Sequence, residues 1–299
     1  MIRLAIILSV AFFSITPSAS AQSCPGNPVA VQILGSGGPS LDRDRASASY
    51  LVWIGGQAKI LVDAGGGTFL RFAQAEARYF DLSLIAISHL HPDHVSDLPA
   101  LLWPAYDPRK GPPLVIAGPS GNDVAPDFST FLSRLFDQNN GAFQVLGVRL
   151  RTRRDVPVQV VSDATKREPS IIFSGQDVTV TSIGVPHGNM PALAYRVQAQ
   201  NKTIVFSGDQ NGSDRRFVEF ARGADVLVMH LAIRGPKSDD LHASPGVVGQ
   251  VARDAHVGRL VLGHIGRSLN PLEPYIAEVR KYYVGPLIVG ADLQCTPVP

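Results

Sequence analysis

Three imidazoles and one carboxylate fall within a run of six residues in the first third of the chain. The run, residues 89–94 (HLHPDH), holds three of the eight histidines in the sequence. Neutral imidazoles bind borderline cations such as Zn²⁺, and a carboxylate adds charge and a ligand atom that can bridge. Four ligands this close do not wrap one tetrahedral ion. We therefore predict two metal ions, with His89 and His91 on one and Asp93 and His94 on the other.

The segment before this run favours a built site over a chance cluster. Residues 82–87 are an apolar run typical of a buried strand. The ligands then follow the carboxyl end of a strand, which is where α/β proteins place their chemistry. A solvated loop with chance histidines is the competing interpretation, and clustered His and Asp argue against it.

The order of motifs resembles the metallo-β-lactamase superfamily, in its ribonuclease Z-like branch. The His-x-His-x-Asp-His run is similar to the superfamily signature, and residues 31–39 (VQILGSGGP) are similar to the opening of the branch. His187 in VPHG, Asp209 in FSGD and His264 in LGH follow in the family's order. The resemblance extends from about residue 29 to residue 293. It implies an α/β (α+β) fold, the four-layer αβ/βα sandwich of two mixed β-sheets flanked by helices.

The resemblance also implies a ligand set and a mechanism. One ion would be held by His89, His91, His187 and Asp209, and the other by Asp93, His94, Asp209 and His264. The nucleophile would be a hydroxide that bridges the two ions, because zinc lowers the pKa of bound water to near 7. We expect two zinc ions, with manganese or iron as alternatives, and we count Asp93 as a catalytic residue as well as a ligand.

His242, in the segment DDLHAS, is the second expected catalytic residue. Ribonuclease Z relatives keep at this place a histidine that donates a proton to the leaving group, and imidazole titrates near the neutral pH that this role needs. The relatives also carry His-Glu-Ala-Thr, whose glutamate orients that histidine. This chain reads His230-Leu231-Ala232-Ile233 instead. We expect His230 to be structural, with Asp239 or Asp240 as candidates to replace the glutamate.

The N-terminus has the pattern of an export signal. A basic start at Arg3 precedes an apolar run over residues 4–15 and the small-residue cleavage site Ala19-Ser20-Ala21. We expect residues 1–21 to be a cleaved signal peptide, residues 22–299 to be a single domain, and the mature protein to be periplasmic or secreted. No other segment is long and apolar enough to cross a membrane.

The two cysteines fit an oxidising compartment. Cys24 follows the expected cleavage site, and Cys295 lies close to the C-terminus. Domain termini are often close in space, so we predict a disulfide between them. Two free thiols, or a lipid on Cys24, are the alternatives.

These features predict an exported dinuclear zinc hydrolase that acts on a small-molecule ester, either a phosphodiester or an aryl sulfate. A β-lactam hydrolase is one alternative, although Asp209 looks like a bridging aspartate that zinc β-lactamases usually lack. A metal-binding relative without activity is another, because Leu231 replaces the glutamate. We expect no membrane partner, and a homodimer is compatible with the sequence.

We expect transfer RNA to be an improbable substrate. His187 and Asp209 are only 22 residues apart, which leaves no room for the long arm that transfer RNA-maturing relatives often insert there. The formal net charge is only +2, and the one basic cluster, residues 149–154, is more typical of a solvated edge than of a nucleic-acid surface.

Hydrophobic periodicity and turn residues predict alternating strands and helices. Strands are expected over residues 29–34, 49–54, 59–63, 82–89, 114–117, 177–185, 195–197, 203–207, 224–229, 260–262 and 287–289. Helices are expected from residue 69 to 77, 97 to 102, 128 to 136, 216 to 221, 245 to 256 and 271 to 283.

Overall fold

The computed structural model describes residues 24, 26–103, 114–147 and 158–299. The signal peptide expected over residues 1–21 and the basic cluster over residues 149–154 lie outside the described residues. Within the described part of the chain, no helix has the length and apolar character needed to cross a bilayer.

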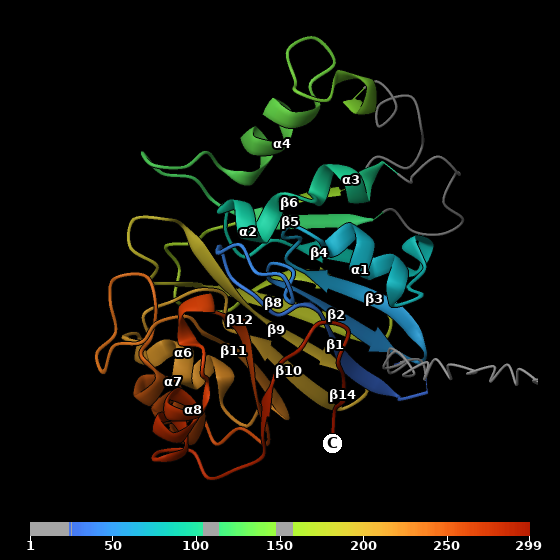
Figure 1. Cartoon of the computed structure of the whole chain (residues 1–299). Helices are drawn as coiled ribbons and strands as arrows, with labels where there is room; N and C mark the ends of the chain where they lie inside the picture. Colours follow the sequence, from blue (N-terminus) through green and yellow to red (C-terminus); the bar gives the residue numbers. More distant parts are fainter. Residues whose placement is uncertain (1–23, 25, 104–113, 148–157) are drawn as a thin grey trace, which may run out of the picture.

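Two seven-stranded β-sheets face each other (Figure 1). The first has the order β14-β1-β2-β3-β4-β5-β6, and the second has the order β13-β12-β11-β10-β9-β8-β7. Each sheet contains both parallel and antiparallel neighbours. In the first sheet the neighbours from β14 through β1 and β2 to β3 are antiparallel, and those from β3 through β4 and β5 to β6 are parallel. In the second sheet the neighbours from β7 through β8 and β9 to β10 are antiparallel, and those from β10 through β11 and β12 to β13 are parallel. The strands of the first sheet are β1 Val29–Gly35, β2 Ser49–Ile54, β3 Gln57–Val62, β4 Leu84–Ala86, β5 Val115–Pro119, β6 Val158–Ser162 and β14 Cys295–Pro297. Those of the second are β7 Ser170–Ser174, β8 Val178–Val185, β9 Ala192–Ala199, β10 Lys202–Phe206, β11 Val226–Leu231, β12 Leu260–Ile265 and β13 Leu287–Val289.

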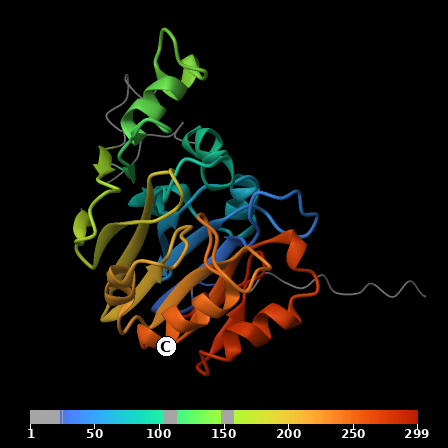
Figure 2. The ribbon, with the colours of Figure 1, turned by 90° about the vertical axis from the view of Figure 1, so that its left-hand side faces the viewer.

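Three apolar cores separate four layers. One core lies between the sheets and joins side chains such as Val31 and Val62 to Tyr195 and Val228. A second core joins the outer face of the second sheet to α6 Arg215–Ala221, α7 Pro245–Asp254 and α8 Glu273–Arg280. A third joins the first sheet to α1 Thr68–Gln74, α3 Leu98–Leu102 and α4 Phe128–Phe136. Figures 1 and 2 show the two helical layers on opposite sides of the paired sheets, which confirms the predicted sandwich.

Local signals explain where several helices begin. The Asp127 carboxylate accepts the Thr130 N–H at the start of α4, and the Ser244 hydroxyl accepts the Val247 N–H at the start of α7, where Pro245 occupies the first turn. Such caps satisfy N–H groups that have no partner inside the helix. The predicted boundaries of α4 are confirmed, whereas α8 is shorter than the predicted 271–283.

The strands that carry the predicted ligands end at the same edge of the sandwich. β4 leads into residues 89–94, β8 leads to His187, β10 leads to Asp209, and β12 contains His264. The Leu193 N–H donates to the Ser88 carbonyl across the two sheets, and Gly37 bridges to Ile265. Segments that are far apart in the sequence therefore meet at one place.

The predicted disulfide between Cys24 and Cys295 is present, with the two Cα atoms 5.6 Å apart. It joins residues 271 positions apart and sits in the third core. Cys295 begins β14, which pairs with β1 through Gln32. The bond therefore attaches the C-terminal strand to the beginning of the described chain.

Replacement of both cysteines by serine should lower the free energy of unfolding by about 3–5 kcal/mol, because the bond closes nearly the whole chain and restricts the unfolded state. Urea denaturation followed by circular dichroism measures this. A reductant should lower the free energy of unfolding of the wild type and leave that of the double variant unchanged. A loss below about 1 kcal/mol would contradict the prediction.

Candidate metal centre

The seven side chains predicted as metal ligands lie together at this edge. Together with His242 they form four overlapping groups, and within each group the ligand atoms are all within 4.8 Å of one another. The groups are His89, His91 and His187; His89, His94 and Asp209; Asp93, His94 and His264; and His187, Asp209 and His242. Asp209 is in two groups, where the resemblance placed a shared ligand, and the second of these also contains His242.

Three imidazoles form the first half of the cluster. His91 Nδ1 lies 3.0 Å from His89 Nε2 and 3.2 Å from His187 Nε2. His89 and His187 are buried, whereas His91 is partly exposed. Three ring nitrogens that converge in this way can present their lone pairs to one cation.

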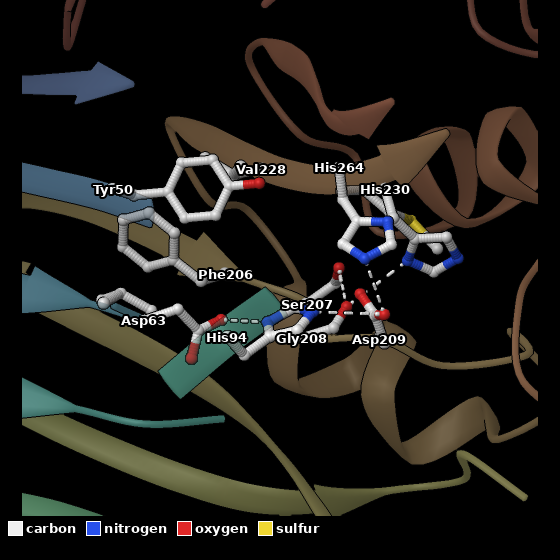
Figure 3. Close-up of a pocket in the computed structure, with 12 residues that line it drawn as sticks. Tyr50, Asp63, His94, Phe206, Ser207, Gly208, Asp209, Val228, His230 and His264 are labelled. Atoms are coloured by element: carbon white, nitrogen blue, oxygen red, sulfur yellow. Dashed lines mark hydrogen bonds and ion pairs between the residues drawn. The ribbon is translucent and has the colours of Figure 1, made fainter. Parts of the chain in front are cut away.

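The second half combines two imidazoles with two carboxylates. His264 Nε2 lies 3.1 Å from Oδ2 of both Asp93 and Asp209, and His94 Nε2 lies 3.5 and 3.4 Å from the same two atoms. Figure 3 shows His94, Asp209 and His264 turned toward one another, with Asp63 on the far side of His94. This half is therefore richer in negative charge than the first.

Hydrogen bonds on the far ring nitrogen fix two of these imidazoles. His187 Nδ1 lies 2.8 Å from the Leu241 carbonyl, so that nitrogen carries the proton and donates it, and Nε2 keeps its lone pair. His94 Nδ1 lies 2.8 Å from the Asp63 carboxylate. Partners of this kind set the tautomer and the orientation of metal-binding histidines.

Asp63 is a residue of this site that the sequence reasoning missed. Its buried carboxylate accepts the Ser88 N–H at 2.7 Å and the Ser88 hydroxyl at 2.9 Å, and it also contacts His94. Its φ of 60° is uncommon for a residue with a side chain. An aspartate at the end of an apolar strand and before three glycines was the available signal.

Burial and charge divide the imidazoles into two classes. Burial lowers the pKa of His89, His91 and His187, to about 4 for His187. Burial acts in the same direction on His94 and His264, but nearby carboxylates outweigh it. The pKa of His94 is therefore raised well above its usual value, and that of His264 is raised to about 9.

His242 lies beside the cluster and is held by its own loop. Its Nε2 lies 3.1 Å from Asp209 Oδ2, and its side chain is 14% exposed. Asp239 Oδ1 accepts the N–H groups of Leu241 and His242 and lies 4.0 Å from His242 Nδ1. The main-chain carbonyl of Asp240 accepts the Gly188 N–H. Of the two aspartates considered from the sequence, Asp239 is the one beside the ring.

His230 fixes the other side of the same loop. Its Nε2 accepts the Ala243 N–H at 3.0 Å, and burial lowers its pKa to about 3, so the ring stays neutral and keeps that acceptor. Leu231 points to the opposite face of β11 and packs in the outer core. The leucine that replaces the family glutamate is thus a core residue, while His230 faces the site.

The buried donor set fits divalent metal ions. Among the described residues, His94 Nε2 makes no hydrogen bond although it is buried between two carboxylates. Buried polar atoms are normally satisfied, so an orphan nitrogen between two carboxylates fits a site for a cation. Imidazole and carboxylate ligands suit zinc, and they also accept manganese or iron.

Comparison with known proteins places residues 58–265 in a family described as a β-lactamase superfamily domain. Ribonuclease Z of Mycolicibacterium paratuberculosis (strain ATCC BAA-968 / K-10) is 30% identical over 285 residues, which cover 89% of this chain and 96% of that protein. Ribonuclease Z of Mycobacterium bovis (strain BCG / Pasteur 1173P2) is 28% identical over 281 residues, 88% of this chain and 96% of that protein.

Solved structures share the fold. The metallo-β-lactamase fold protein YhfI from Bacillus subtilis matches with a TM-score of 0.71 and 18% identity, over 90% of this chain and 100% of that chain. The short form of human tRNase Z matches with a TM-score of 0.68 and 19% identity, over 90% of this chain and 99% of that chain.

These relatives overturn the expectation that transfer RNA is an improbable substrate. That expectation used the short connection between His187 and Asp209, yet the chain covers 96% of relatives named ribonuclease Z. A structure named tRNase Z is covered over 99% of its length. The short connection therefore does not set this chain apart from proteins of that name, and the exclusion was wrong.

Metal uptake should release protons mainly from the second half of the cluster. At pH 7 the metal-free His94 and His264 hold protons because their pKa values are raised, whereas His89, His91 and His187 are already neutral. Loading should therefore release about two protons at pH 7, and affinity should rise with pH at least as far as about 9, where His264 loses its proton. Titration calorimetry in buffers of different ionisation enthalpy counts these protons.

The variant with His89→Ala and His91→Ala is the matched control, because it keeps the second group and should release a similar number of protons for the ion that remains. Fewer than one proton released by the wild type would contradict the assignment.

Proposed function

The chain belongs to the metallo-β-lactamase superfamily as a relative of ribonuclease Z, a metal-dependent hydrolase, and from this premise we propose that it hydrolyses phosphodiester bonds with two divalent metal ions. The observation that carries the proposal is the convergence of five imidazoles and two carboxylates from four strand ends. We also propose that it acts after export, which the Cys24–Cys295 bond supports because such bonds persist in oxidising compartments.

The proposed ligands follow the two halves of the cluster. His89, His91 and His187 would hold one ion, Asp93, His94 and His264 would hold the other, and Asp209 would contact both. Bound divalent ions would supply positive charge to polarise a phosphoryl oxygen and would activate a water molecule as the nucleophile. Zinc is the proposed metal.

Residues of the chain have two further tasks in the reaction. When water attacks phosphorus and the bond to the leaving oxygen breaks, that oxygen needs a proton. His242 is the side chain we assign to give it, because its ring lies at the edge of the cluster and is partly exposed. Asp239 and His230 keep this ring in place through main-chain N–H groups on either side of it.

A phosphodiester is favoured over other esters by the relatives. Their name, ribonuclease Z, supports RNA as one class of substrate for this chain, and small phosphodiesters offer the same bond in a simpler form. Aryl sulfates and β-lactams serve as the competing substrates in the test.

The proposal is tested with the full chain expressed in bacteria, purified from whole cells and loaded with zinc. Bis-p-nitrophenyl phosphate, a precursor transfer RNA, p-nitrophenyl sulfate and nitrocefin are assayed side by side. Turnover of at least one phosphodiester should exceed the other two rates, and His89→Ala with His91→Ala should remove about one zinc per chain and the activity. A nitrocefin rate far above the rest would overturn the proposal. An N-terminus at Gln22 is expected, and an uncleaved one would overturn export.

Replacement of His242 by alanine should lower kcat by about 10²–10⁴-fold on RNA, because the leaving alkoxide needs a proton donor. The loss should be much smaller on bis-p-nitrophenyl phosphate, whose phenolate leaves without protonation. Zinc content should stay unchanged. His256→Asn, at an exposed histidine with a positive φ that asparagine tolerates, is the control. Equal losses on both substrates would exclude His242 as the proton donor.

A further inference from the structure

The carboxylate of Asp292 accepts hydrogen bonds from both ends of the β1–β2 loop and from α1. Its Oδ1 accepts the N–H and the hydroxyl of Ser36 at 3.0 and 2.8 Å. Its Oδ2 accepts the Ala46 N–H at 2.8 Å and the Arg71 Nε–H at 3.1 Å. The side chain is only 8% exposed. Four donors on one nearly buried carboxylate make it the anchor of the β1–β2 loop and of α1.

Arg45 strengthens the same anchor. Its Nη1 donates at 2.7 Å both to the Ser36 hydroxyl and to the Gly290 carbonyl. Residues 290–294 connect β13, at the edge of the second sheet, to β14, at the edge of the first. Asp292 therefore lies on a connection between the two sheets and holds the β1–β2 loop against it.

The anchored loop forms a wall of the second half of the metal cluster. The Ser36 carbonyl accepts the Ile265 N–H at 2.8 Å, next to His264. The backbone of Gly38 lies against the His264 ring, because a Cβ at Gly38 would be 2.7 Å from Cε1. The Ser47 N–H donates to Gly66, and a Cβ at the adjacent Gly65 would be 2.0 Å from the Asp93 carbonyl.

His264 depends on this wall more than the other imidazoles do. His187 and His94 are oriented by partners on Nδ1, whereas His264 Nδ1 is buried and makes no hydrogen bond to any described residue. Its Nε2 is directed toward the carboxylates of Asp93 and Asp209, so the other side of the ring is held by packing, and Gly38 is one of the groups packed against it. A shift of the β1–β2 loop would therefore move the ring directly.

The disulfide holds the same connection at its other end. Cys295 lies three residues after Asp292, and the Leu293 N–H donates to the Ile33 carbonyl at 2.7 Å. The Ile33 N–H in turn donates to Gln294 at 3.0 Å. The disulfide to Cys24 thus fixes the end of the connection that carries Asp292.

We propose that Asp292 is a positioning residue for the metal ion held by Asp93, His94 and His264, and that the Cys24–Cys295 bond keeps it in place. The inference rests on the proposed function, because it assigns Asp292 to one of the two proposed ions. Loss of the carboxylate should lower the affinity for that ion about tenfold and leave the affinity for the other ion unchanged. Tenfold is the lower end of the effect of residues that orient metal ligands without touching the metal.

The experiment measures both zinc dissociation constants by competition with a chromophoric chelator, together with amide exchange at Ile265 in the metal-free protein. Asp292→Asn keeps the shape of the side chain and removes its charge. Asp292→Ala removes all acceptors. Asp225→Asn is the matched control, because this carboxylate also accepts a main-chain N–H, from Thr203 at 2.7 Å, at the opposite end of the second sheet. Gly38→Ala acts on His264 directly and shows that the assay detects such a change.

Both Asp292 variants should lower the affinity for one zinc ion and speed amide hydrogen exchange at Ile265. The control variant Asp225→Asn should do neither. Replacement of both cysteines by serine should act in the same direction by a smaller factor. Combined with Asp292→Asn it should be less than additive, because both changes act through one connection. Should Asp292→Ala not fold, Asp292→Asn carries the test.

The outcomes separate the two proposals. A wild type that takes up no zinc overturns the proposed function, and this inference with it. The inference alone is overturned if three results are found together. The wild type binds two zinc ions, Gly38→Ala weakens the binding of one of them, and both Asp292 variants bind the two ions with affinities within twofold of those of the wild type.

Discussion

The site depends on burying many ionisable groups where the two sheets meet. Removing a charge from water costs several kcal/mol unless partners replace the lost hydration. Asp209 meets this cost by lying within 3.4 Å of the imidazoles of His94, His242 and His264. Asp63 meets it with the N–H and hydroxyl of Ser88 and with His94. In the metal-free protein the three carboxylates are partly neutralised by His94 and His264, the two imidazoles whose pKa values are raised.

This balance explains why the cluster suits a cation. His94 and His264 hold protons only because carboxylates surround them, so a divalent ion can replace those protons without changing the sign of the local charge. The first half has no such carboxylate of its own and is neutral from the start. The two halves would therefore offer different environments to the two proposed ions.

One loop serves both a proposed ligand and the proposed proton donor. The Leu241 carbonyl orients His187, and the next residue is His242. The loop is fixed by Asp239 on one side and by His230 and the Gln210 carbonyl on the other. The family glutamate is not needed to hold the loop, because a neutral buried imidazole and a nearby carboxylate take main-chain N–H groups instead.

Much of the fold was predictable from the sequence, because long apolar strands and capped helices carry their own signals. β1, β2, β8 and α4 begin and end within a residue or two of the predicted positions. β6 and β7 were missed because their side chains are largely exposed and give no buried pattern. β14 was missed because three residues are too few for periodicity.

The site itself was predictable only as far as its motifs reach. The motif residues come together as expected. Asp63 had a local signal, its place at a strand end before glycines, but its hydrogen bonds to Ser88, like those of Asp292 to Ser36 and Ala46, join segments that are far apart in the sequence. The side chains of β11 alternate between the two faces of the sheet, and Leu227, Met229 and Leu231 all lie in the outer core. Leu231 therefore points away from His242.

The order of the strands in the two sheets connects the C-terminal part of the chain to the site. β13 and β14 are edge strands of different sheets, so the five residues between them must cross from one sheet to the other. A short crossing that carries Asp292 can hold both sheets and the loop beside His264 in one register. The disulfide three residues later fixes the outer end of that crossing to the start of the described chain. Because residues far along the chain set the wall of the cluster, a bond between the termini can influence a site with which neither cysteine is in contact.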